Sequence, residues 1–96
     1  MYSVVRQYSG ENASKLFDNL EANTKEVEKI ISEVKGFVSY TLMRTSKGGV
    51  SVTVCKDKAG ADESSQRAAK WVKEHMSVKV TAPTVTEGSV LIHRNK

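Results

Sequence analysis

The hydrophobic and polar residues of this chain alternate with two distinct periods. Four segments rich in β-branched and aromatic residues show the two-residue alternation typical of strands. Two longer segments carry apolar residues at the three- and four-residue spacing of amphipathic helices. In chain order, these periods predict a strand at 2–8, a helix at 13–34, strands at 37–44 and 50–56, a helix at 61–76 and a strand at 85–93. The Gly-containing turn at 46–49 joins the two middle strands into a hairpin.

This order of elements predicts one α+β domain spanning residues 1–96. Strand, helix, hairpin, helix and strand follow one another as in the ferredoxin-like βαββαβ motif. We therefore expect a four-stranded antiparallel sheet with two helices on one face and the other face open. A chain of this length has little room for a second domain, and its core is thin.

The first predicted helix is long, with about six turns. Its buried stripe consists of Ala13, Leu16, Phe17, Leu20, Thr24, Val27, Ile31 and Val34. We expect a kink near Asn23 and Thr24, and Gly36 ends the helix. The stripe of the second helix is smaller and consists of Ala61, Ser65, Ala68, Ala69, Val72 and Met76.

Residues two apart on a strand share one face of the sheet. The strongly apolar sets are expected beneath the helices: Val38, Tyr40 and Leu42; Val50, Val52 and Val54; Val90 and Ile92. The opposite sets are Phe37, Ser39, Thr41 and Met43; Ser51, Thr53 and Cys55; Ser89, Leu91 and His93. This second face has no charge at its centre, which favours its burial against a second copy of the chain. The alternative is an ordinary exposed sheet rich in Thr and Ser.

Charge and composition exclude several classes of partner. The formal net charge is +4, from 15 Lys and Arg against 11 Asp and Glu. The basic excess is scattered rather than gathered in a stripe, so we expect no nucleic-acid partner. The single cysteine, Cys55, rules out an internal disulfide and a cysteine-based metal site. Without a signal-peptide core or a run of 18 apolar residues, we expect no membrane partner and a cytoplasmic location.

Two residues of the second predicted helix are candidates for binding or chemistry. Trp71 and His75 are four residues apart and therefore share a stripe. With Tyr40, they are candidates for lining a ligand pocket between helix and sheet. Trp71 would stack on a flat compound there, and His75 would transfer a proton. The simpler interpretation makes Trp71 a space-filling core residue and His75 a polar residue at a helix end.

Other candidate residues carry weaker signals. Tyr8, Tyr40 and Arg6 could supply hydroxyl or cationic contacts to a ligand, although Arg6 is also interpretable as a solvated strand residue. His75 and His93 lack a carboxylate three or four residues away, so no metal site is predicted. No nucleophile elbow, phosphate-binding loop or dinucleotide fingerprint occurs in the chain.

The chain as a whole resembles the dimeric α/β-barrel proteins of the antibiotic-biosynthesis-monooxygenase-like kind. Three features carry this resemblance: the passage Val-Lys-Gly-Phe-Val-Ser-Tyr at 34–40, the hairpin, and the segment from Trp71 to His75. The resemblance implies that two sheets face each other to form a barrel. Some such proteins oxidise polycyclic aromatic or quinol substrates without metal or flavin, and some degrade haem, in a cavity between helices and sheet.

The haem-degrading proteins of this kind place an Asn on the first strand, a Trp in the sheet and a His on the second helix. Only His75 matches that pattern here, because the strand at 2–8 has no Asn and the only Trp is helical.

The leading interpretation is a homodimeric α/β-barrel protein, without a cofactor, that binds a small apolar or aromatic ligand between helices and sheet. One alternative is a cofactor-independent monooxygenase acting on an aromatic or quinol-like substrate, with His75 as acid and base. The other is a nucleic-acid-binding module. Whether the chain is an enzyme stays open at this point.

Overall fold

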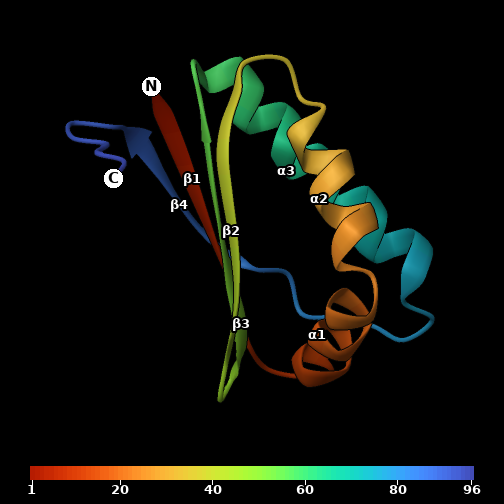
Figure 1. The fold of residues 1–96 in the computed structure, drawn as a ribbon. Coiled ribbons are helices and arrows are strands. Elements are labelled where there is room, and N and C mark those ends of the chain that lie inside the picture. Colours follow the sequence, from red (N-terminus) through yellow and green to blue (C-terminus); the bar gives the residue numbers. More distant parts are fainter.

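The computed structural model describes residues 1–96 and contains one sheet and three helices. The elements are β1 (Tyr2–Tyr8), α1 (Ala13–Ala22), α2 (Thr24–Ser32), β2 (Phe37–Thr45), β3 (Gly48–Cys55), α3 (Lys58–His75) and β4 (Thr84–Ser89). All neighbouring strands are antiparallel, in the order β2-β3-β1-β4. This is the predicted ferredoxin-like βαββαβ arrangement, with the first helical segment divided into α1 and α2 (Figure 1).

The division falls at Asn23, where the sequence predicts a kink. Asn23 leaves the helical conformation, and its backbone N–H bonds to the carbonyl of Leu20 instead of continuing the four-residue pattern. Its side-chain amide donates to the carbonyl of Asn19 at 2.8 Å and so satisfies the acceptor that the backbone leaves free. As a result, α1 packs on β3 and α2 packs on β2.

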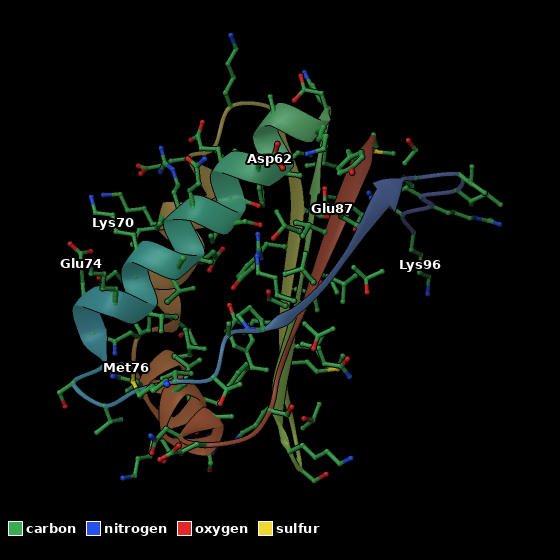
Figure 2. All side chains as sticks on the ribbon, turned by 180° about the vertical axis from the view of Figure 1, so that it is seen from behind. Asp62, Lys70, Glu74, Met76, Glu87 and Lys96 are labelled. Carbon is green, nitrogen blue, oxygen red and sulfur yellow. The ribbon has the colours of Figure 1, made fainter.

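All three helices cover the same face of the sheet, and the opposite face is bare (Figure 1). Between helices and sheet lies a core cluster of Tyr8, Leu16, Phe17, Leu20, Val27 and Trp71. On the outer side of α3, Lys70 and Glu74 point away from the sheet (Figure 2). None of the helices has the length and apolar character needed to span a membrane.

The faces of β3 are the reverse of those predicted. Ser51 and Thr53 are buried beneath the helices, where both hydroxyls accept hydrogen bonds from the guanidinium of Arg6. Val50 and Val52 therefore lie on the open face. The prediction was wrong because it ranked the two sets by hydrophobicity alone, whereas a buried guanidinium requires polar partners.

The start of β2 also departs from the predicted alternation. The register shifts between Phe37 and Ser39, since Phe37 pairs with Cys55 and Ser39 pairs with Val54. This irregularity is a β-bulge, which reverses the alternation at the strand end. Phe37 therefore lies on the helix side, in a surface hollow shared with Val27, and not on the open face.

The open face of the sheet has no charged side chain. Residues paired directly across strands share a face, so the register identifies its members. They are Ser3, Val5 and Gln7 of β1; Ser39, Thr41 and Met43 of β2; Val50, Val52 and Val54 of β3; Thr84, Thr86 and Gly88 of β4. The face lacks charge, as predicted, but the reversed β3 makes it more apolar than expected.

The last strand is shorter than predicted. β4 ends at Ser89, which pairs with Tyr2, the first residue of β1, and only one further backbone bond follows, from Val90 N–H to the Met1 carbonyl. The following segment leaves the sheet on the side away from the helices (Figure 1). Leu91 and Ile92 are 94% and 87% exposed there. The expectation that Ile92 packs beneath the helices is therefore wrong.

Candidate functional site

The candidate site lies in the layer between α3 and the sheet, where two spaces adjoin. A small apolar cavity of about 20 Å³, room for about one water molecule, is lined by Trp71, Tyr8 and Tyr40 among other residues. A groove of about 330 Å³ lies between α3, the loop that precedes β4, and β4 itself. Tyr8 and Val72 line both spaces, so we call these two side chains the partition.

Trp71 supplies an unused hydrogen-bond donor at this site. The residue is 4% exposed, and its indole Nε1 is buried without any hydrogen-bond partner. A buried donor left unpaired costs about 1–3 kcal/mol. An acceptor that reaches this N–H would recover part of that cost. Trp71 is thus more than a filler of space in the core.

The phenols of Tyr8 and Tyr40 are held in their neutral form. Burial raises the pKa of Tyr40 to about 12, and the charge of Arg6 opposes this shift without cancelling it. Burial likewise raises the pKa of Tyr8 above its ordinary value. Near neutral pH both groups are therefore O–H donors at the wall of the cavity.

His75 lies behind Trp71 rather than in the cavity. Its ring stacks on the indole with centroids 4.1 Å apart and planes 9° from parallel. His75 Nδ1 is 2.9 Å from the carbonyl oxygen of Trp71, and Nε2 is 3.2 Å from the Glu26 carboxylate on α2. His75 lines neither the cavity nor the groove. The structure thus brings Trp71 and Tyr40 together at the cavity and places His75 outside it.

Arg6 is buried at the centre of the layer, with only 2% of its surface exposed. Its interpretation as a solvated residue is therefore wrong. Four hydroxyls surround its guanidinium. Nη1 donates to Ser51 and Thr53 at 3.1 Å each, Nε donates to Ser65 at 3.2 Å, and Nη2 donates to Ser64 at 2.6 Å.

The alternation of β1 contains the signal that would have revealed this burial. Val4, Arg6 and Tyr8 occupy every second position of the strand, and Val4 and Tyr8 are plainly core residues. Arg6 must share their face. The hydroxyl partners were harder to find, because they come from β3 and α3, which are distant in the sequence.

The groove combines an apolar wall with a few polar side chains. The wall is formed by Ala69, Val72, Val80, Pro83 and Val85. Two of its polar residues, Arg6 and Ser65, are joined by the hydrogen bond that Arg6 Nε donates to Ser65 Oγ. A groove of this volume, largely apolar with a few converging polar groups, has the character of a small-molecule site.

Metal ligands are not gathered at this site or elsewhere. No group of three or more His, Cys, Asp or Glu side chains is placed to hold a metal ion. His93 belongs to the segment after β4 and lines neither the cavity nor the groove.

Comparison with known proteins finds likeness in structure alone. No protein-family model and no curated protein sequence matches the chain. Among solved structures, the haem degrader MhuD (Rv3592) of Mycobacterium tuberculosis, with two haems bound in its active site, has a TM-score of 0.66 and 14% identity. That match covers 99% of this chain and 100% of the other. A dimeric ferredoxin-like protein from an uncultured marine organism has a TM-score of 0.64 and 17% identity, covering 99% and 96%.

A third similar structure is the monooxygenase from ActVA-Orf6 of Streptomyces coelicolor, in complex with nanaomycin D. It has a TM-score of 0.59 and 20% identity, covering 96% of this chain and 91% of the other. At such identities the likeness shows the fold and nothing finer. The fold is the predicted ferredoxin-like one, shared with dimeric α/β-barrel proteins of the antibiotic-biosynthesis-monooxygenase-like kind.

Proposed function

We propose that the protein binds a small, flat aromatic compound between α3 and the sheet, and that it does so as a homodimer. One observation carries the first part: a groove and a small cavity adjoin there, with Tyr8 and Val72 as the partition. The rings of the bound compound fill the groove. Its far edge enters the cavity when the Val72 side chain turns aside, and an oxygen on that edge accepts the unused N–H of Trp71.

The energetics favour a compound with a flat ring system. The apolar wall of the groove removes a flat ring system from water, at about 25 cal/mol per Å² of apolar surface buried. A carbonyl or phenolic oxygen that accepts from the unpaired indole N–H gains a hydrogen bond, and no bond within the protein has to be broken for it. A flat compound with an oxygen substituent on the edge that faces Trp71 meets both requirements.

Fluorescence titration with 2-naphthamide tests this proposal, because Trp71 is the only tryptophan of the chain. We expect saturable quenching. Val72→Ala, which opens the partition, should tighten binding, and Val72→Phe, which fills it, should weaken binding by about tenfold or more. Gln66→Ala is the matched control, since Gln66 is exposed on the same helix and lines neither space. Absence of saturable quenching, or equal affinity in both Val72 variants, would contradict the proposal.

Haem does not fit the residues of this chain. The Nε2 atom of His75, which would be the natural iron ligand, faces Glu26 outside the cavity. We therefore do not extend the haem binding of the mycobacterial neighbour to this protein.

The homodimer is proposed from the open face of the sheet. That face has no charged residue, and Val5, Val50 and Val52 lie side by side on its central strands. Met43 on the neighbouring strand is 49% exposed. Two copies that close their open faces against each other form a barrel and remove this apolar surface from water. The dimeric ferredoxin-like neighbour supports this assembly.

A second candidate function is the oxidation of a phenol by O₂ without a cofactor. The observation in its favour is the row of neutral donors, Tyr8, Tyr40 and the Trp71 N–H, beside a cavity with almost no room for water. The structural neighbour from Streptomyces coelicolor, a monooxygenase, adds support. In this reaction one oxygen atom enters the ring to give a quinone, and the other leaves as water. His75 would position Trp71 rather than touch the substrate.

An oxygen electrode with 1-naphthol as substrate tests this second candidate. Each molecule of naphthoquinone formed should consume one molecule of O₂, and Trp71→Phe should slow the reaction while Gln66→Ala leaves it unchanged. Saturable binding of the naphthol without oxygen uptake would reduce the function to binding alone.

A further inference from the structure

The charge of Arg6 has no counter-ion inside the protein. All four of its hydrogen-bond partners are neutral hydroxyls, and no carboxylate lies within ion-pair distance of its guanidinium. The ion pairs of the chain lie nearer the surface, such as that of Arg44 with Asp18. A buried guanidinium stays protonated in proteins, so the layer between α3 and the sheet contains one uncompensated positive charge.

The other ionisable groups nearby cannot neutralise it. Those that act on Arg6 are Tyr8, Tyr40 and Cys55. Burial raises the pKa of each of the three, so each is uncharged near neutral pH. Burial also lowers the pKa of Arg6, in keeping with the cost of holding the charge there.

Four hydroxyls surround the guanidinium of Arg6, and one of them, that of Ser65, belongs to a residue that lines the groove. Arg6 and Ser65 both line the groove, whereas Ser51, Thr53 and Ser64 hold the guanidinium from behind. The four contacts leave one of the five guanidinium N–H groups without a partner. Because hydroxyls both accept and donate, Ser65 can also donate to a ligand while it accepts from Nε.

We propose that the ligand of the groove is an anion, an aromatic compound with a carboxylate that pairs with Arg6 and Ser65. This inference rests on the proposed binding function and names the chemical class of the ligand. A carboxylate matches the planar guanidinium, and a charge-assisted bond in a site away from water is stronger than a neutral one. The same anion supplies the counter-ion that the folded chain lacks.

Two probes of equal shape test the inference: 2-naphthoate and its neutral amide, 2-naphthamide, compared by calorimetric titration. We expect the wild-type protein to bind the carboxylate at least about tenfold more tightly than the amide. Arg6→Gln should abolish this preference, and Arg6→Lys should keep part of it. Arg44→Gln is the matched control, because it removes a surface arginine with a carboxylate partner.

The outcomes separate this inference from the function on which it rests. If neither probe binds the wild-type protein, the proposed binding function fails. If both bind equally, or if Arg6→Gln keeps the preference, binding stands and the anionic ligand is wrong. Should Arg6→Gln fold poorly, the wild-type comparison and Arg6→Lys still decide, and 2-naphthoate should raise the melting temperature of the wild-type protein more than 2-naphthamide does.

Discussion

At the scale of single residues, burial sets the chemistry of this protein more than residue type does. Arg6, Tyr8 and Tyr40 are polar residues on strands, a setting in which each is commonly solvated. Here they meet beneath α3, where the two phenols stay neutral and the guanidinium lacks a counter-ion. Their proximity could not be derived from spacing, since Tyr40 lies on a strand two places away in the sheet from Arg6 and Tyr8.

The raised pKa of Tyr40 predicts a loss of stability in alkali. The unfolded chain loses this proton near pH 10, whereas the folded chain keeps it until about 12. The stabilisation from the buried neutral phenol is therefore fully present below pH 10 and is lost as the pH rises through about 12. We expect the free energy of unfolding to fall by on the order of 2 kcal/mol over this window.

Urea denaturation at about pH 9, 10 and 11 measures this loss, with Tyr40→Phe as the test variant. The variant should show a clearly smaller decrease than the wild-type protein across the series, because phenylalanine has no proton to lose. Parallel curves for the two proteins would mean that the ionisation of Tyr40 does not limit alkaline stability.

At the scale of elements, the sequence predicted well which segments form helices and strands. It predicted less well which face of a strand points toward the core. The four strands and the helical segments were predicted because their periods are long and regular. The helix break at Asn23 was partly foreseen, since an amide side chain there can compete for a backbone carbonyl. The end of β4 was not, because it depends on where its partner β1 begins.

The reversal of β3 shows the limit of reading a strand alone. Val50 and Val52 are more hydrophobic than Ser51 and Thr53, so hydropathy places the valines inside. The hydroxyls nevertheless lie on the inner face, because the buried guanidinium of Arg6 on the adjacent strand needs hydrogen-bond acceptors. If a second sheet covers the open face, the valines are also removed from water. Both faces of β3 are then buried, which is consistent with its hydrophobic sequence. Of the site, Trp71 and Tyr40 were predictable as wall residues; the groove, which needs the loop before β4, was not.

At the scale of the whole molecule, the fold is one-sided. Three helices lie on one face of the sheet (Figure 1). By the strand register, the other face carries mostly valine, methionine, serine and threonine. A small domain gains little stability from a single thin core. The uncharged face is therefore a surface through which this chain can bury additional area, on the side of the sheet away from the proposed ligand site.

This one-sidedness predicts that a single charge on the open face separates the dimer. Val52 lies at the centre of that face, paired with Val5 on one side and Thr41 on the other. By light scattering after size exclusion, the wild-type protein should have about twice the 10.6 kDa mass of one chain. Val52→Lys should run as a single folded chain, because its ammonium is solvated in the monomer but buried unpaired in the dimer. Gln66→Lys, with the same charge on exposed α3, should stay dimeric. A wild-type monomer, or a dimer that survives Val52→Lys, would move the interface away from the sheet.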